Sequence, residues 1–281
     1  MNTFSPPIQP QLTQPLRDLD AWTSHFRAAQ IPVLTQTSEA LEALRANEDN
    51  ADASSIGEMI SSDPLMTLKV LAHASAHRSS RAVTDIETII AALVMMGISP
   101  FFAAFGPQPT IEDWLADNPQ ALAGLDETLR RAHRSANFAL AFAVHRMDAD
   151  AAMVHAAASL HDFAEMLLWC HAPALALRIQ AAQRADASLR SSAVQLSVLN
   201  VELADLQQSL MRSWRLPELL IRISDERHAD NANVRSVTLA VRLARHTAQG
   251  WDNAAIPDDV KDIAALLNMS QAATLQFVRE I

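Results

Sequence analysis

The sequence predicts an all-α fold. Ala and Leu dominate the 281 residues, whereas Gly occurs only 5 times and Tyr is absent. Ala and Leu are strong helix formers, and the β-branched residues that favour strands occur only in short runs. Alternation of apolar and polar residues never extends beyond a few positions. We therefore expect neither a sheet nor a fold in which strands and helices alternate.

The composition also limits the classes of function. The formal net charge is −10 and the isoelectric point is about 5.4, whereas a duplex-binding surface needs many Lys and Arg side chains. The single cysteine, Cys170, excludes an internal disulfide and a Cys-rich zinc module, and it fits a reducing cytoplasm. The first residues lack the basic and apolar regions of a signal peptide. We expect a cytoplasmic protein that binds neither nucleic acid nor a membrane.

Proline and glycine divide the predicted helices into segments. Residues 1–16 hold four of the 13 prolines and are expected to be flexible. We then expect a main domain over residues 17–250. This domain is expected to consist of an N-terminal helical lobe (residues 17–110), a linker (residues 111–126) and an HD-like bundle (residues 127–250). A helical tail, residues 251–281, follows it.

Local signals place individual helix ends. Asp63-Pro64 predicts a sharp helix start, because the Asp side chain can accept from the first free N–H groups and Pro suits the first helical position. Thr84-Asp85-Ile86-Glu87 predicts a second start as a capping box. Residues 196–213 predict one long helix, which ends at the Trp214-Arg215-Leu216-Pro217 turn.

The longest apolar stretch runs from Ile89 to Gly106. Its length raises the question of a membrane span, but Gly97, Ser99 and Pro100 interrupt it and no Lys or Arg flanks it closely. We expect two buried helices that meet at a turn.

His161-Asp162 is the most informative pair for function. It follows an apolar helix, and an imidazole nitrogen and a carboxylate oxygen on adjacent residues can share one divalent cation. Neighbouring helical side chains diverge by about 100°, so a helix end must bring the two together. The pair alone is unspecific. In the alternative interpretation, Asp162 caps the next helix and His161 is a core histidine.

Five short motifs, in their order and spacing, resemble the HDOD family over about residues 31 to 250. They are Ile31-Pro32-Val33-Leu34, Ile60 to Leu71, Ile86 to Gly97, Leu160-His161-Asp162-Phe163 and Trp214-Arg215-Leu216-Pro217. The resemblance implies an all-helical fold in which an HD-like bundle packs on an N-terminal helical lobe. It also implies kinship with HD phosphohydrolases, whose active members bind one or two metal ions and hydrolyse phosphate esters.

The sequence departs from the HD ligand pattern at most positions. By the resemblance, Arg134 stands where the first His is expected, and His133 lies one residue away. Arg227-His228 replaces a His-His pair. Val241 replaces the last ligand Asp, and an aliphatic side chain cannot donate to a metal.

Two of the four primary ligands survive by this resemblance, His161 and Asp162. Two ligands rarely hold a divalent ion, and Arg134 would place a permanent cation where the metal should sit. We therefore expect no catalytic residue, no bound metal and no other cofactor. An Arg134–Asp162 ion pair is expected to fill the vacated site; if a metal binds at all, His161 and Asp162 hold it.

Two further polar clusters are candidates for contact with an anion or a partner. They are the basic face Arg130, Arg131, His133 and Arg134, and the helix end His73, His77 and Arg78. The basic face suits an anion such as a cyclic dinucleotide, and histidines at i and i+4 suit a metal. A solvated helix surface is the alternative for both clusters. Trp22 with Phe26 either packs in the core or lines an exposed groove.

The leading interpretation is a non-catalytic module of bacterial signal transduction that acts through protein contacts. A kinase or a cyclic-dinucleotide enzyme is the expected partner, and self-association is a further expectation. One alternative is a metal-dependent phosphohydrolase with non-standard ligands, drawn from His133, His161, Asp162 and His228. The other is a nucleotide-sensing pocket without hydrolysis, in which Arg134 and His161 contact the anion.

Overall fold

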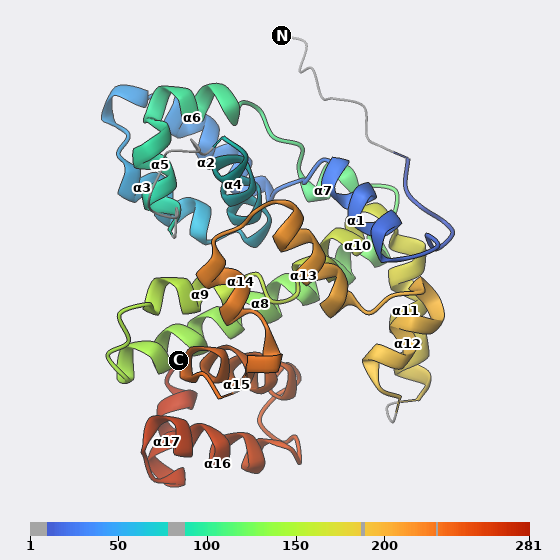
Figure 1. Cartoon of the computed structure of the whole chain (residues 1–281), viewed down its shortest axis with the longest axis vertical. Coiled ribbons are helices and arrows are strands. Elements are labelled where there is room, and N and C mark those ends of the chain that lie inside the picture. Colours follow the sequence, from blue (N-terminus) through green and yellow to red (C-terminus); the bar gives the residue numbers. More distant parts are fainter. Residues whose placement is uncertain (1–9, 78–87, 187–188, 229) are drawn as a thin grey trace. The chain divides into compact units, whose positions relative to one another are not determined.

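The computed structural model describes residues 10–77, 88–186, 189–228 and 230–281. These residues form helices, joined by short connections, and Figure 1 draws every labelled element as a coiled ribbon. Outside the helices, Val33 and Thr110 form an isolated parallel bridge, and no strand occurs in the ranges just given. The predicted all-α class is confirmed. Arg78 and the predicted capping box Thr84–Glu87 lie outside the described residues.

The chain forms two compact units, and each unit is built from two separate stretches of sequence. Unit 1 comprises residues 1–128 and 162–216, and unit 2 comprises residues 129–161 and 217–281. This division differs from the expected lobe and bundle, which were contiguous in sequence. The reason is that residues 162–216 return to pack on the first helices of the chain, and a single sequence does not reveal such long-range contacts.

Unit 1 holds the helices that precede residue 128 and those between residues 162 and 216. The first group is α1 (Leu19–Ala28), α2 (Thr35–Arg45), η1 (Glu48–Asn50), α3 (Ala53–Ser61), α4 (Pro64–Ala76), α5 (Ile89–Met96), α6 (Ile98–Ala104) and α7 (Ile111–Trp114). The second group is α10 (Phe163–His171), α11 (Pro173–Ala185), α12 (Ser191–Leu199) and α13 (Leu203–Ser213). Helix α1 packs on α13, and α4 packs on α10, so the two stretches share one core.

Unit 2 is built around α15, which packs on α9 and α16, while α17 packs on α16. Its elements are α9 (Ala151–Ser159), α14 (Glu218–Ile223), η2 (Glu226–His228), α15 (Ala232–His246), α16 (Ile256–Leu267) and α17 (Gln271–Arg279). Helix α8 (Pro119–His145) contributes its first turns to unit 1 and the remainder to unit 2. The expected helical tail is thus α16 and α17.

The predicted linker, residues 111–126, is largely helical. It contains α7 and the first turns of α8. The Asn118 side chain accepts a hydrogen bond from Ala121 N at 3.1 Å, and Pro119 is the first residue of the helix. Asn118-Pro119 is thus the same start signal as Asp63-Pro64. The apolar spacing is weak in this range, although the cap is clear.

Two other predictions about helices need correction. Residues 196–213 are not one helix, because Asn200 adopts the left-handed conformation, with φ 65°, and separates α12 from α13. The apolar stretch does form two helices that meet at Gly97, which has φ 85°. However, α5 is only partly buried: Ile90, Val94 and Met95 are 46%, 69% and 59% exposed. Within the described ranges, no helix is both long and apolar enough to cross a membrane.

Asp63 joins two segments of unit 1. One carboxylate oxygen accepts from Leu65 N at 2.9 Å and Met66 N at 3.1 Å, as the predicted cap of α4. The other accepts from Leu34 N at 2.9 Å. The side chain is fully buried, and this burial raises the pKa of Asp63 more than the backbone donors lower it. The buried carboxylate therefore fixes the segment before α2 against the start of α4.

Lys69 lies one turn further along α4, with its ammonium group largely withdrawn from solvent. Its Nζ donates to Ile31 O at 2.9 Å and to Gln108 Oε1 at 2.5 Å. Burial lowers the pKa of Lys69 to about 8, although the nearby charge of Asp63 opposes the shift. Because the pKa is ~10.5 in an unfolded chain, the folded state releases this proton first. The contribution of Lys69 to stability therefore rises with pH between about 8 and 10.5.

This titration can be measured directly, because Lys69 and Lys261 are the two lysines of the chain. In protein labelled with carbon-13 lysine, we expect the Lys69 side-chain resonances to titrate near pH 8. A Lys69→Met variant, which lacks these resonances, assigns them, and the exposed Lys261 remains as the internal reference. A Lys69 midpoint above pH ~10, where unburied lysines titrate, would show that burial does not perturb the amine.

Trp22 and Trp114 lie in the core of unit 1. Trp22 is fully buried and donates from Nε1 to Leu199 O at 2.9 Å, and its ring lies 5.4 Å from that of Phe26. The core prediction for this pair is confirmed, and the alternative of an exposed groove is wrong. Trp114 likewise donates to Cys170 O at 2.9 Å. Both indoles join α1 or α7 to the second stretch of unit 1, which explains why that stretch belongs to this unit.

Candidate functional site

Helix α8 presents a basic face in unit 2. Arg130 is followed three and four residues later by His133 and Arg134, and Asn137 lies three residues after Arg134, so these side chains lie on one side of the helix. Arg134 is held by two kinds of contact. Its Nη1 donates to Thr247 O at 3.1 Å, and its guanidinium carbon lies 5.6 Å from the centre of the Phe138 ring. The residue that replaces the expected ligand His is therefore held by the end of α15 and by an aromatic ring.

The predicted His161-Asp162 pair stands at the boundary between the units. His161 follows α9 in unit 2, and its Nε2 lies 3.1 Å from Glu226 Oε1. Asp162 occupies the N-cap position of α10 in unit 1, but its side chain accepts no hydrogen bond from the amides of that helix. The Arg134–Asp162 ion pair would join different units, and it stays a prediction.

The η2 turn surrounds a carboxylate that the sequence analysis missed. Asp225 is 9% exposed, and Arg227 donates to both of its oxygens, from Nε at 2.8 Å and from Nη2 at 2.9 Å. These hydrogen bonds lower the pKa of Asp225. His228 Nε2 lies 3.9 Å from the same carboxylate. Thus Arg227 and His228, where the resemblance implies a His-His pair, are engaged with Asp225.

Val241 lies in the middle of α15 and is 2% exposed. It is flanked by the buried Ala240 and by Leu243, so its side chain belongs to the core of unit 2. The side chain at the position of the last HD ligand can therefore neither coordinate a metal nor donate a hydrogen bond. Among the residues that the structure describes, no group of three or more His, Cys, Asp or Glu side chains could hold a metal ion.

The second predicted cluster is a stacked histidine pair at the end of α4. The rings of His73 and His77 lie 4.1 Å apart, and His77 Nδ1 lies 2.9 Å from His73 O. Burial, and then the proximity of His77, lower the pKa of His73. The two imidazoles therefore stack on each other at the helix end.

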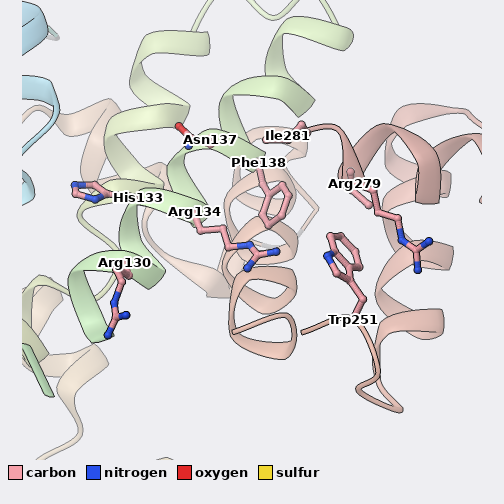
Figure 2. Close-up of a pocket in the computed structure, with 9 residues that line it drawn as sticks. Arg130, His133, Arg134, Asn137, Phe138, Trp251, Arg279 and Ile281 are labelled. Atoms are coloured by element: carbon pink, nitrogen blue, oxygen red, sulfur yellow. The ribbon is translucent and has the colours of Figure 1, made fainter. Parts of the chain in front are cut away.

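A pocket of about 390 Å³ opens beside the basic face of α8. Arg130, His133 and Arg134 line it from α8, as Figure 2 shows, and Arg279 lines it from α17. Phe138, Trp251 and Val278 supply apolar surface. The structure thus brings three members of the predicted basic face into one pocket.

The sequence analysis missed Trp251 and Arg279 as members of this pocket. Trp251 follows Gly250, outside the regular apolar spacing of the helices, and an aromatic residue in a polar loop was the available signal. The guanidinium carbons of Arg134 and Arg279 lie 5.8 and 5.4 Å from its ring centre. Figure 2 shows the indole between these two arginines. Arg279 has no comparable signal, because it is a lone basic residue at a helix end.

Comparisons with known proteins place these features in a family context. The model of the HDOD domain family matches residues 31–230. The crystal structure of the MmoQ response regulator from Methylococcus capsulatus str. Bath is similar, with a TM-score of 0.65 and 16% identity, over 89% of this chain and 98% of that chain. A virulence factor from Campylobacter jejuni subsp. jejuni has a TM-score of 0.61 and 18% identity, over 93% of this chain and 97% of its own. No curated protein matches the chain.

Proposed function

This chain belongs to the HDOD domain family, and from that premise we propose that it is a non-catalytic module of bacterial signal transduction that acts through contacts with other proteins. The proposal is supported by the residues at the ligand positions that the family resemblance implies, because these residues do not suit a metal ion. Val241 is a buried aliphatic residue at the last ligand position, and Arg134 is held between Thr247 O and aromatic rings at the first. Hydrolysis by a metal-bound water needs a ligand set that these side chains do not supply.

The exposed face of α5 supports a role in protein contacts. Ile90, Val94 and Met95 are exposed in a unit that otherwise buries most of its large apolar side chains. Contiguous apolar side chains on a surface are typical of contacts with proteins. The similarity to a protein described as a response regulator agrees with a signalling role. We propose a kinase or a cyclic-dinucleotide enzyme as the partner.

Capture from the source cells tests this function with a matched pair of variants. Val94→Glu charges the α5 face, whereas Leu196→Glu charges another exposed apolar side chain, on α12, that is 47% exposed against 69% for Val94. We expect the wild type and Leu196→Glu to retain the same signalling protein, and Val94→Glu to lose it. If the three proteins capture the same set, or nothing specific, the interaction role is contradicted. If the protein has a phosphodiesterase activity that Asp162→Ala abolishes, the metal-dependent phosphohydrolase replaces the interaction module as the function.

A further inference from the structure

The pocket beside α8 carries positive charge without a carboxylate side chain in its lining. Arg130, Arg134 and Arg279 contribute guanidinium groups, and no Asp or Glu side chain lines the pocket. Ile281, the last residue of the sequence, also lines it, so one main-chain carboxylate stands against three guanidinium groups. Glu280 is adjacent in sequence, but its carboxylate accepts from Gln276 Nε2 at 3.0 Å. Like charges held close together repel each other, and an anion between them relieves that repulsion.

The negative formal net charge of the chain is not shared by unit 2. The first stretch of unit 2, residues 129–161, contains four Lys or Arg residues and two Asp or Glu residues. The second stretch, residues 217–281, contains seven Lys or Arg residues and nine Asp or Glu residues. Unit 2 is thus formally neutral, and the whole net charge of −10 belongs to unit 1. The negative net charge of the whole chain therefore does not oppose the binding of a small anion at this pocket.

Two of the arginines are held in place before any ligand arrives. Trp251 contacts both Arg134 and Arg279, at 5.8 and 5.4 Å from its ring centre, and Arg134 also contacts Phe138. The recorded hydrogen bond to Thr247 O uses one N–H of Arg134, and a guanidinium group carries several. Side chains that are already ordered lose less entropy on binding, so this arrangement favours recognition of an anion.

The shape of the pocket narrows the class of ligand. Its volume of about 390 Å³ lies in the lower part of the range for small-molecule sites, ~300 to 1,000 Å³. Phe138 and Val278, which are buried, and Trp251, which is partly exposed, supply the apolar part of the lining next to the arginines. Guanidinium groups match phosphate oxygens in geometry and charge. The site thus offers cationic contacts for a phosphate and apolar contacts for the group attached to it.

We propose that this pocket binds a phosphate-bearing small molecule of about the size of a mononucleotide. The phosphate contacts Arg134 and Arg279, and the organic group rests against Phe138 and Val278. The proposal assigns a ligand site to unit 2, and it does not depend on the interaction role, whose test face lies on α5 in unit 1.

Isothermal titration calorimetry with the full chain tests the proposal, with adenosine monophosphate, adenosine and inorganic phosphate as probes. We expect adenosine monophosphate to bind more tightly than either of the other two, and more weakly as the salt concentration rises. Arg279→Gln and Arg134→Gln are each expected to weaken this binding about tenfold or more, because each removes a charge-assisted contact. Arg222→Gln, which removes an exposed charge of the same unit outside the pocket lining, should leave the affinity unchanged within about twofold.

Arg279→Gln is the decisive variant, because Arg134 also supports the end of α15 and its replacement can perturb folding. Absence of heat with adenosine monophosphate at millimolar concentration overturns the proposal. Equal affinity for adenosine overturns it as well, because the phosphate would then contribute nothing. Binding that both arginine variants retain in full places the ligand elsewhere and has the same consequence.

Discussion

Replacement of Asp63 by Ala is expected to lower the free energy of unfolding by about 3 to 5 kcal/mol. The variant removes the acceptor of three backbone N–H groups: those of Leu65 and Met66, which are buried, and that of Leu34, which is partly buried. Each buried donor that is left without a partner costs about 1 to 3 kcal/mol. Urea unfolding followed by circular dichroism measures the loss. The expected order of stability is wild type, then Asp63→Asn, which keeps one oxygen acceptor, then Asp63→Ala.

Asp52→Ala is the matched control for this loss. Asp52 caps α3 by the same chemistry, accepting from Ser54 N at 2.8 Å and Ser55 N at 2.9 Å, but its side chain is exposed. Water can replace that cap, so we expect a much smaller loss. Because the charge of Asp63 raises the pKa of Lys69, Asp63→Ala should also shift the Lys69 titration to lower pH. If Asp63→Ala and Asp52→Ala lose equal stability, the buried carboxylate has no special role.

Introduction of an aspartate at Val241 is expected to destabilise unit 2 by about 3 to 5 kcal/mol at neutral pH. The position is 2% exposed in the middle of α15, so the variant would bury a carboxylate among apolar side chains. Burial raises the pKa of such a group above its value in the unfolded chain. The penalty is therefore largest at neutral pH and decreases as the pH falls below the raised pKa. Chemical denaturation at pH 4 and pH 7 measures this difference.

Val241→Thr separates the effect of charge from that of shape. Threonine has nearly the same volume as valine and an uncharged hydroxyl group. Val241→Thr should therefore lower the free energy of unfolding by less than Val241→Asp, and by the same amount at every pH. The opposite result would be a stable Val241→Asp protein that binds one metal ion per chain. It would mean that one residue is enough to restore a ligand set, and it would contradict the expectation that the core around residue 241 does not tolerate a carboxylate.

Local chemistry made much of the fold predictable. The start of α4 at Asp63-Pro64 and the end of α5 at Gly97 could both be predicted. A helix cap and a residue with positive φ depend only on neighbours within a few positions. The family resemblance likewise depends on short motifs whose order is visible in the chain. Predictions failed where one residue decided the outcome: Asn200 interrupts a run that is otherwise helical, and Asn118 starts α8 inside a weak pattern.

Only the part of the candidate site that depends on neighbouring residues could be predicted from the sequence. The basic side chains of α8 follow one another at helical spacing, so their common face could be read from the sequence alone. Val241 could be recognised as an aliphatic replacement of a ligand once the resemblance was established. Neither observation predicted the aromatic contact that holds Arg134, nor the engagement of His228 with Asp225.

By itself, the sequence determined the all-α class and the family, and it predicted that Arg134 and Val241 stand where ligands are expected, because these depend on residue identity and on contacts within a few positions. Only the tertiary structure decided that residues 162–216 belong to the first unit, and that Arg134, Trp251 and Arg279 meet in one pocket. These residues are separated by more than a hundred positions or lie on separate helices. They are brought together by burial of apolar surface, which depends little on direction or on distance along the chain.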